Sequence, residues 1–449
     1  MILVLPVEVK KREFIPKLFL SYNLIKKFKG KLKIILGSQS DIHQKLNIRN
    51  CIYIDKGSGT IVLWLLKLLK KQGNLIYQLD EEGPICGMEK FEKLRRYPKE
   101  IYEIVDNFFA WGKKDILFFK KNSKKKKFHL IGHPKFDLLE KKNIKIFEDQ
   151  VKHIKKKYNN FIFFASSFSH DGILNEKISK KYVESYLPRR KNLIKNDEFQ
   201  LNERKKDYLF IIDNLKKLSD KNKNLKIIFR PHPVQDIEKV KKRFIDYKNI
   251  IVDGNYTITP WIISSKLYIH SGCTTSFEAC KLKKKSVLLV RNFRNIDNII
   301  YKYGVRINKF KKLNSVINNQ IKINFNNTLE KEVFNIKKLT IFSDKFLKQI
   351  KKEKLMNSSY DFKVNNDSFL KNMIFKLLSI IKNTNLISSI LPYFFSGNIL
   401  LSKEYKKQKF GSLDIAEIKN NLKKFDNIEK NKIKVNIKMI SKNIFELKR

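Results

Sequence analysis

The sequence has few of the features that mark disulfide-rich, zinc-binding or membrane-spanning proteins. Its 449 residues include four cysteines, Cys51, Cys86, Cys273 and Cys280, whose spacing fits neither a zinc site nor a disulfide framework. The longest apolar run, residues 61–66, is far shorter than the about 18 apolar residues that a membrane helix needs. Residues 1–8 lack the basic start and the cleavage site of a signal peptide, which predicts a buried first strand and a cytoplasmic protein.

Acidic side chains are also scarce, since 44 Asp and Glu stand against 96 Lys and Arg and leave a net charge of +52. Such a charge would ordinarily suggest a nucleic-acid partner. Here the excess is mostly lysine, accompanied by abundant Asn and Ile as in proteins from AT-rich genomes, whereas nucleic-acid readers favour arginine. No nucleic-acid-binding module is recognisable, so we expect no nucleic-acid partner. Lysines are attracted to an anionic leaflet by about 1 kcal/mol each, which predicts peripheral contact with the inner face of the cytoplasmic membrane.

Short apolar runs that end in polar or glycine-containing tips recur along the chain and alternate with helical patterns. Parallel strands need crossover helices, so this alternation predicts doubly wound α/β sheets. The pattern restarts near residue 145, which predicts two Rossmann-like domains, residues 1–144 and 145–322, that face each other across a cleft. The predicted strands cover residues 1–7, 33–36, 51–55, 74–78, 107–111, 128–131, 161–165, 227–229, 249–252, 267–269 and 286–290, and the predicted helices cover residues 15–28, 176–186, 198–218, 330–352 and 367–382.

Beyond residue 322 the chain is rich in Lys, Asn and Ile and has few signals of a sheet. Residues 323–449 are therefore predicted to form a mostly helical, basic extension. Because both α/β patterns are complete before it, a chain that ends near residue 326 is expected to stay soluble and to bind nucleotide. A small aromatic cluster at residues 393–395 is expected to cover the cleft, pack on the first domain or touch a membrane.

Two strand tips carry the predicted donor site. Residues 227–229 lead into Arg230-Pro231-His232-Pro233, and residues 267–269 lead into a Ser- and Thr-rich segment before a helix that begins at Phe277. In an open α/β sheet, ligands bind outside the carboxyl ends of strands, so both tips are expected to face one crevice. Hydroxyls, two basic side chains and a helix start together suit a phosphate or a diphosphate. The candidate donor-binding residues are Arg230, His232, Pro233, Ser271, Gly272, Thr274, Thr275, Ser276 and Glu278, with Ser166 and Ser167 from the tip after residues 161–165.

The most acidic short segment, Asp80-Glu81-Glu82, follows the strand at residues 74–78 and precedes Gly83. Mutual repulsion raises the pKa of at least one of three adjacent carboxyl groups, which suits a general acid or base or a carboxylate nucleophile. These three residues are the catalytic candidates. Polar residues at two further tips are the acceptor-side candidates, namely Glu8, Arg12, Glu13 and His133.

Each of these motifs also has a purely structural explanation. The prolines at 231 and 233 can simply end a strand, and the hydroxyls of the second tip can simply cap a helix. The acidic segment can be a solvated turn or the docking point of a basic partner, and His133 can cap or pack. The motifs are therefore weighed as a set rather than singly.

Two of these motifs together resemble a known family. Arg-Pro-His-Pro followed by His-Ser-Gly-Cys-Thr-Thr-Ser-Phe-Glu-Ala resembles the donor half of GT-B glycosyltransferases that build bacterial surface polysaccharides. The likeness is greatest to transferases of CMP-activated acidic sugars, including the β-Kdo transferases of capsule and lipopolysaccharide assembly. In that group a His-Pro motif and a Ser/Thr-rich helix start hold the nucleotide phosphate. A strand-end acidic pair before glycine carries the catalytic carboxylate, and Glu81-Glu82-Gly83 resembles it, with Glu where Asp would be expected. The resemblance covers roughly residues 1–320.

The resemblance implies a GT-B fold and a transferase that moves a Kdo-like or other nonulosonic acid from a CMP donor. The acceptor would be a glycan or a lipid-linked glycan, and no metal or other cofactor is expected. Glycerol- and ribitol-phosphate polymerases of the teichoic-acid type share a similar arrangement and would use a CDP donor, so they are an alternative. A basic scaffold without enzymatic activity is a third. The acceptor, the anomeric outcome and the oligomeric state remain open.

Overall fold

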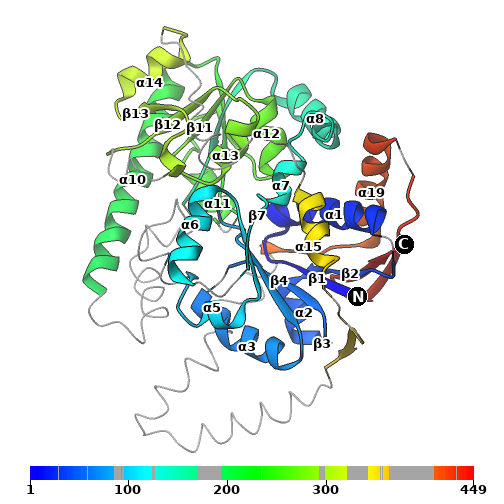
Figure 1. The fold of residues 1–449 in the computed structure, drawn as a ribbon. Helices are drawn as coiled ribbons and strands as arrows, with labels where there is room; N and C mark the ends of the chain where they lie inside the picture. Colours follow the sequence, from blue (N-terminus) through cyan, green and yellow to red (C-terminus); the bar gives the residue numbers. More distant parts are fainter. Residues whose placement is uncertain are drawn as a thin grey trace, which may run out of the picture.

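The computed structural model shows two α/β sheets, one built from the first and last parts of the chain and the other from its middle part (Figure 1). It describes residues 1–449 except residues 29, 58, 85–92, 94–95, 124–126, 169–193, 234, 293–298, 321–341, 354, 356, 364–408 and 431, and except the side chains of residues 60–61 and 194–201. The predicted helices at 176–186 and 367–382 and the aromatic cluster at 393–395 lie outside the described residues. The predicted fold class, α/β with two Rossmann-like domains, is confirmed.

The first sheet has the order β15-β16-β2-β1-β4-β5-β6-β7. The six strands from β2 to β7 are mutually parallel, and β16 pairs antiparallel with β2. The central strands β2, β1, β4, β5 and β6 form because they are short, mostly apolar runs that can be buried on both faces, as parallel strands require. The strands of the sheet are β1 (Ile2–Val7), β2 (Lys33–Ser38), β4 (Ile52–Asp55), β5 (Leu75–Leu79), β6 (Asn107–Ala110), β7 (Lys127–Leu130), β15 (Asn436–Ser441) and β16 (Ile444–Lys448).

Helices cover both faces of this sheet. Leu3, Leu5 and Val7 of β1 belong to the apolar cluster on one face, and Ile2 and Val4 belong to the cluster on the other, as the alternation of side chains along a strand dictates. The first face carries α1 (Lys10–Lys27), α7 (Pro134–Asp137), η3 (Ile144–Phe147), α15 (Phe342–Ile350) and α19 (Ile415–Glu429). The second carries α2 (Gln39–Lys45), η1 (Gly59–Val62), α3 (Leu63–Lys71), α5 (Ile101–Ile104) and α6 (Lys113–Asn122), beside a small sheet of β3 (Leu46–Arg49) and β14 (Ser359–Phe362).

The second sheet has the order β10-β9-β8-β11-β12-β13, with all of its strands parallel. This is the doubly wound order in which the chain reverses direction across the sheet between its first and fourth strands, here β8 and β11. The strand β13 was not predicted. The strands are β8 (Phe161–Ala165), β9 (Lys226–Arg230), β10 (Ile250–Val252), β11 (Leu267–His270), β12 (Ser286–Leu289) and β13 (Val305–Ile307), and the helices are α8 (Glu148–Tyr158), α10 (Ile194–Lys221), α11 (Ile237–Lys242), α12 (Ile258–Ser264), α13 (Thr275–Lys281), η5 (Ile299–Tyr301) and α14 (Phe310–Ile317).

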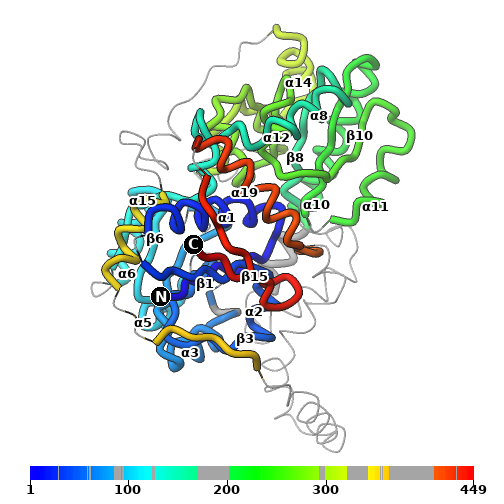
Figure 2. Tube along the Cα trace, turned by 90° about the vertical axis from the view of Figure 1, so that its right-hand side faces the viewer, coloured from blue at the N-terminus to red at the C-terminus, as the bar shows by residue number. Residues whose placement is uncertain are grey.

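The described part of the C-terminal region completes the first sheet instead of forming a separate extension (Figure 2). It contains helices, as predicted, but also the strands β14, β15 and β16, which were not. Side chains of β16 such as Phe445 are fully buried in the first core. On α19, the ring of Phe425 lies 5.0 Å from that of Phe19 and 5.5 Å from that of Tyr22, both on α1. These apolar contacts join residues far apart in sequence, so the local sequence of the extension did not indicate that it packs into the first core.

We therefore expect the opposite of the solubility predicted for a chain that ends near residue 326. A chain that ends there lacks α15, α19 and β16. Apolar side chains of α1 would then be uncovered and β2 would be an open edge, so the shortened protein should aggregate. In the full chain, Phe425→Ala should lower the free energy of unfolding by about 3–5 kcal/mol in urea titrations. Met439→Ala on β15, where the side chain is 59% exposed, is the matched control and should change it little. A soluble shortened chain with the unfolding midpoint of the full chain would contradict this reading.

Candidate functional site

The acidic segment follows β5 directly, and its first carboxylate is a structural anchor. Asp80 is 2% exposed and accepts hydrogen bonds from Arg96 Nη2 at 2.7 Å, from Arg96 Nε at 3.1 Å and from the Tyr97 hydroxyl at 2.9 Å. Burial raises the pKa of Asp80, and the Arg96 guanidinium opposes that rise. With its oxygens engaged in this way, Asp80 holds the loop in place and is poorly placed to act on a substrate.

Glu81 lies in a second buried network. Its carboxylate, also 2% exposed, is 2.9 Å from Lys17 Nζ and 3.1 Å from His133 Nε2. Lys17 further donates to the Pro6 carbonyl at 2.6 Å and to Glu13 at 3.1 Å, so this network joins β1, α1, the β5 tip and the β7 tip. Burial alone would raise the pKa of Glu81, but Lys17 and His133 outweigh it and hold the pKa well below its usual range. Glu81 is therefore a buried anion with two partners.

His133 belongs to the same network and is 1% exposed. Its Nδ1 accepts a hydrogen bond from the Lys135 N–H at 3.2 Å, which assigns the ring proton to Nε2, the atom that faces Glu81. Burial lowers the pKa of His133 to about 4 although Glu81 opposes the shift, so the ring is neutral at pH 7. Sequence placed this residue on the acceptor side, whereas the structure places it behind Glu81 as a hydrogen-bond donor.

Glu82 is the most exposed of the three carboxylates, with 45% of its side chain accessible. One of its oxygens is 3.0 Å from Arg96 Nη1, and the other is 4.0 Å from Arg12 Nη2. Of the residues proposed for catalysis, it is thus the one whose carboxylate both reaches solvent and lies between two guanidinium groups. Two cations beside one carboxylate favour its ionised form.

The acceptor-side residues at the first strand tip have different roles from one another. The helix α1 begins at Lys10, five residues earlier than predicted, and the Glu13 carboxylate accepts from the N–H groups of Glu8 at 2.9 Å and Val9 at 3.3 Å. Glu13 therefore caps its own helix, fully buried, and is not available to a substrate. Glu8 is partly exposed and is paired with Lys56 at the β4 tip and with Lys409 at 2.6 Å. In the first sheet, β1 and β4 are the strands between which the chain reverses direction, so this pair spans the usual ligand position of the fold.

The corresponding position in the second sheet lies between β8 and β11, and two predicted donor residues meet there. The Ser167 and Ser271 hydroxyls are 2.8 Å apart across the two strand tips. Ser166 accepts from the Phe168 N–H at 3.3 Å. Gly272 has φ of +84°, and a Cβ at that position would run into the ring of Tyr301. Sequence analysis assigned Gly272 to donor binding, whereas in the structure the Tyr301 ring fills the space beside Gly272.

The Ser/Thr cluster after β11 is divided between the surface and the interior. The helix α13 begins at Thr275, two residues earlier than predicted. The Thr275 hydroxyl is 2.5 Å from the Tyr268 hydroxyl, and Ser276 is fully buried with an Oγ that has no hydrogen-bond partner among the described residues. Thr274 is the member of the cluster that points toward the acidic segment. A ligand outside the strand tips could therefore reach Thr274 and Ser271 more readily than the other two hydroxyls.

Arg230 ends β9 as a buried cation. It is 7% exposed and donates from Nη2 to the Tyr256 carbonyl at 3.0 Å, while its Nε has no partner and no carboxylate of the described residues forms an ion pair with it. Burial lowers the pKa of Arg230 to about 10, although Glu278 and Asp253 lie near enough to oppose the shift. After Arg230, the His232 N–H donates to Gln235 at 2.8 Å, and the His232 and Pro233 side chains are half-buried.

The two predicted sites are brought together where the domains meet. A Cβ on Gly83 would lie 2.9 Å from the Thr274 methyl group, so the acidic segment touches the donor tip directly. Trp111, at the tip of β6, donates to the Asp80 carbonyl at 2.8 Å and packs into the apolar cluster of the second sheet, 6.0 Å from the ring of Phe277. The structure therefore brings the acidic segment and the tip of β11 side by side.

Two lysines that sequence reasoning did not single out also link the domains. Lys135 Nζ is 4.0 Å from Glu278, whose other oxygen accepts from the Thr259 hydroxyl at 2.7 Å. Lys11 donates to the Gly254 carbonyl at 2.5 Å, and its pKa is lowered by burial and by Arg230 nearby. Cations of both domains therefore lie around this junction. Lys17 could have been suspected from its place on the apolar face of its helix, but Arg96, Lys11 and Lys135 carry no comparable signal.

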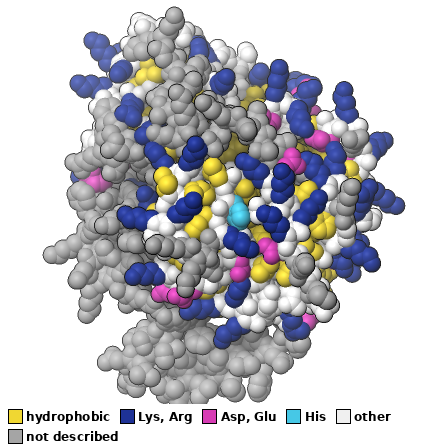
Figure 3. All heavy atoms as spheres, in the orientation of Figure 1, with side chains coloured by type: hydrophobic (Ala, Val, Ile, Leu, Met, Phe, Trp, Pro, Cys, Tyr) yellow, Lys and Arg dark blue, Asp and Glu magenta, His cyan; other side chains and the backbone are white. Residues whose placement is uncertain are grey.

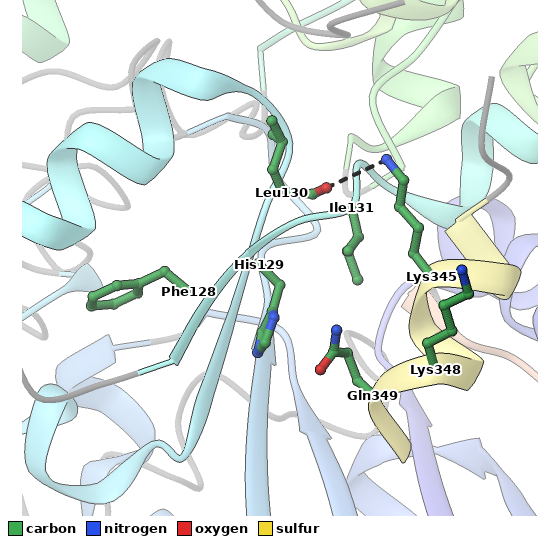
Figure 4. A pocket seen from close by; sticks show the side chains of 7 residues that line it. All are labelled: Phe128, His129, Leu130, Ile131, Lys345, Lys348 and Gln349. Carbon is green, nitrogen blue, oxygen red and sulfur yellow. Dashed lines mark hydrogen bonds between the residues drawn. The ribbon is translucent and has the colours of Figure 1, made fainter. Parts of the chain in front are cut away.

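A pocket of about 280 Å³ lies away from this junction, between β7 and α15 (Figure 4). None of the residues proposed for the site lines it. Its His129 is bonded to Asn107 at 2.7 Å, and burial lowers the pKa of that histidine to about 4. Lys345 donates across the pocket to the Leu130 carbonyl at 3.4 Å. The lining residues are Phe128, His129, Leu130, Ile131, Lys345, Lys348 and Gln349.

Comparison with known proteins gives similarity in structure but not in sequence. No protein-family model and no curated protein matches the chain. Among solved structures, the UDP-GlcNAc 2-epimerase of Methanocaldococcus jannaschii aligns with 79% of this chain and 100% of its own, at 14% identity and a TM-score of 0.48. The UDP-GlcNAc 2-epimerase of Neisseria meningitidis aligns with 79% and 100%, at 12% identity and a TM-score of 0.49. The wall teichoic acid polymerase TagF aligns with 78% and 88%, at 13% identity and a TM-score of 0.47. At this level of similarity, none of the three decides what this chain does.

The buried network around His133 predicts that acid destabilises the protein. The pKa of His133 falls from 6.5 to about 4 on folding. Between pH 6.5 and pH 4, His133 therefore binds a proton in the unfolded chain but not in the folded chain. The free energy of unfolding should therefore decrease as the pH falls from 6.5 to 4, by about 3 kcal/mol from this group. Glu81, whose folded pKa is lowered, adds a loss in the same direction at lower pH.

Urea titrations of wild type and His133→Gln across this range measure the effect, because glutamine cannot titrate but can still donate to Glu81. The variant should lose less stability on acidification than the wild type. Parallel curves for the two proteins would show that His133 does not carry this pH dependence.

Proposed function

We propose that the chain is a glycosyltransferase that moves a sugar from a CMP-activated donor to a cell-surface polysaccharide or glycolipid acceptor. The sugar is a Kdo-like or other nonulosonic acid. The observation that carries the proposal is the buried Arg230 guanidinium, which forms no ion pair within the described residues and lies near Lys11 of the first domain. A buried cation that no carboxylate contacts directly is costly, and an anionic ligand would offset that cost.

The groups around Arg230 suit a nucleoside phosphate. Ser167 and Ser271 stand at the reversal point of the second sheet, where open α/β sheets take their ligands. Thr274 and the half-buried His232 lie at the neighbouring tips, and Lys11 approaches from the first domain. A phosphate group there would meet hydroxyl donors and cations from both domains. The choice of CMP rests on the resemblance of the two motifs and not on these contacts.

Glu82 is the carboxylate that we assign to the chemistry. It is exposed, it precedes the glycine that touches the donor tip, and it lies beside Arg96 and Arg12. Asp80 and Glu81 are instead committed to buried networks. Asp80 fixes the loop through Arg96, and Glu81 fixes it through Lys17 and His133. Both therefore act as positioning residues for Glu82.

Two routes are open to this carboxylate. In a retaining reaction, a Glu82 oxygen attacks the anomeric carbon, the bond from that carbon to the phosphate oxygen breaks, and CMP leaves with the electron pair. The acceptor hydroxyl then displaces Glu82 from the sugar and gives up its proton to water. In an inverting reaction, Glu82 accepts the proton of the acceptor hydroxyl while that oxygen attacks and CMP leaves. In either route negative charge moves from Glu82 to the departing phosphate, where the Arg230 guanidinium would stabilise it.

The first test concerns donor binding. Calorimetry with CMP, CDP and UDP should show a preference for CMP, and His232→Ala should weaken CMP binding by about 1.5–3 kcal/mol. Arg230→Met should abolish measurable CMP binding without lowering the free energy of unfolding by more than about 1 kcal/mol, because it removes an unpaired buried charge. Lys239→Met, an exposed lysine on α11, is the matched control and should change neither quantity.

Three results would count against this assignment. Equal affinity for all three nucleotides would favour a basic scaffold. A preference for CDP would favour a polyol-phosphate transferase of the teichoic-acid type. Unchanged CMP affinity in a folded His232→Ala or Arg230→Met protein would remove the assigned phosphate site.

The second test concerns turnover. Glu82→Gln should keep CMP affinity but lose at least about a hundredfold in the rate of sugar transfer from a CMP-sugar. Glu81→Gln should instead lower the free energy of unfolding by about 3 kcal/mol, because it leaves Lys17 with less compensation in a buried site. Intact-mass spectra of wild type with the CMP-sugar separate the routes, since only the retaining one leaves a sugar on the protein. Normal turnover by Glu82→Gln would show that Glu82 is not the catalytic carboxylate.

A further inference from the structure

We propose that the outward faces of α3 and α6 form a docking surface for an anionic lipid membrane. This α3/α6 surface consists of Trp64, Lys67, Leu68, Lys71, Lys113, Lys114, Leu117, Lys120 and Lys121. Lysine and arginine side chains stand over much of the face drawn in Figure 3, so charge alone does not single out one surface. Exposed apolar side chains among the lysines do. The proposal does not depend on the reaction assigned above.

The helix α3 carries apolar side chains on its exposed face as well as on its buried face. Leu65, Leu66 and Leu69 face the core and are buried. The opposite face, at spacings of three and four residues, holds Trp64 and Leu68 with Lys67 and Lys71 beside them. Trp64 is 62% exposed and Leu68 is 40% exposed, so neither side chain is apolar in order to fill the core. A face of Trp, Leu and Lys without acidic groups is typical of helices that lie at a membrane interface.

The helix α6 repeats the pattern. Phe119 and Asp115 point inward and are buried, whereas Leu117 is 67% exposed. Four exposed lysines surround Leu117 on the outward face: Lys113, Lys114, Lys120 and Lys121. Like α3, this helix therefore combines an apolar centre with a basic rim.

The two helices belong to one layer of the molecule. The helix α3 follows β4 and α6 follows β6, and both pack their inner faces into the same apolar cluster on one side of the first sheet. In Figure 1, α6, α5 and α3 lie along the same side of the first sheet. The short α5 between them adds exposed Glu100 and Glu103, and Asp106 is paired with Lys70 at 2.6 Å.

Lipid fits this surface better than the other anionic partners of a basic protein. Tryptophan and leucine gain by burial at the boundary between headgroups and acyl chains, and lysines around them gain from an anionic leaflet. A nucleic-acid backbone would use the lysines but not the apolar groups. No helix of the described residues is long and apolar enough to cross a membrane, so any attachment through this surface would be peripheral.

Vesicle binding tests the proposal, with Trp64 as a built-in reporter. The chain has three tryptophans, and Trp111 and Trp261 are buried, so a change in emission on binding reports mainly on Trp64. The full chain is mixed with vesicles of phosphatidylcholine alone or of phosphatidylcholine with phosphatidylglycerol. Mixed vesicles should bind it, shift the emission to shorter wavelength and protect it from iodide quenching. Trp64→Phe should abolish the shift.

Matched variants separate this surface from the charge of the whole protein. The double variant Trp64→Ser, Leu117→Ser should weaken binding to mixed vesicles at least about tenfold. The double variant Lys67→Glu, Lys71→Glu should weaken that binding at least about fivefold for each lysine replaced. The control lies on the second domain, where Ile245 is 77% exposed near Lys239 and Lys242. There, Ile245→Ser, and separately Lys239→Glu with Lys242→Glu, should leave vesicle binding within about twofold of wild type.

The proposal is overturned if binding occurs without a change in Trp64 emission, or if the control variants weaken binding as much as the α3/α6 variants. Binding to a nucleic acid or to another protein that protects Trp64, with no binding to mixed vesicles, would overturn it as well. Loss of donor binding or turnover in the variants of the proposed active site would leave the vesicle results unchanged, so the two proposals fail separately.

Discussion

The arrangement of the junction depends on burying Lys17 and Glu81 together. These opposite charges lie 2.9 Å apart with almost no exposure, and each has further partners at a different strand tip. Removing Glu81 would leave Lys17 with Glu13 as its buried counterion, and removing Lys17 would leave the Glu81 carboxylate with the neutral His133, so either change weakens the network. Through Pro6, Glu13 and His133 it fixes the β1 tip, the start of α1 and the β7 tip around the acidic segment. The position of Glu82 follows from that network, although Glu82 itself is not part of it.

Both sheets use the same topological device at this junction. In each, the chain reverses direction across the sheet between two central strands, and polar side chains from the two tips meet there: Glu8 with Lys56 in the first sheet, and Ser167 with Ser271 in the second. Backbone polarity at these tips cannot be paired within the sheet, so hydroxyls and charged groups collect at them. Trp111 then joins the halves by placing its ring in the core of the second domain while its N–H holds the acidic loop.

The parallel strands were predictable because each is a short apolar run that ends in turn-forming residues. The strand β13 was missed because its three residues, Val305–Ile307, contain an arginine and are too few to show a pattern. The strands β15 and β16 were missed because nothing local indicates that they pair with β2, more than half the chain away. In the candidate site, the sequence predicted that the acidic segment and the segments after residues 229 and 269 follow strands, and in the structure they follow β5, β9 and β11. The sequence could not tell which carboxylate is exposed, since the partners that bury Asp80 and Glu81 come from Arg96, Lys17 and His133 on other elements.

The pairing of β16 with β2 has a consequence for the order of synthesis and folding. The second sheet is complete once residue 307 has left the ribosome, whereas the first sheet, though begun earlier, lacks an edge strand until residue 448 has been made. At ordinary rates of translation this delay is on the order of ten seconds. During that time β2 presents an unpaired edge, and the apolar face of α1 that α19 later covers stays in contact with water. Until the last strand is made, the nascent first domain therefore exposes an open sheet edge and an apolar helix face, the two features that promote aggregation.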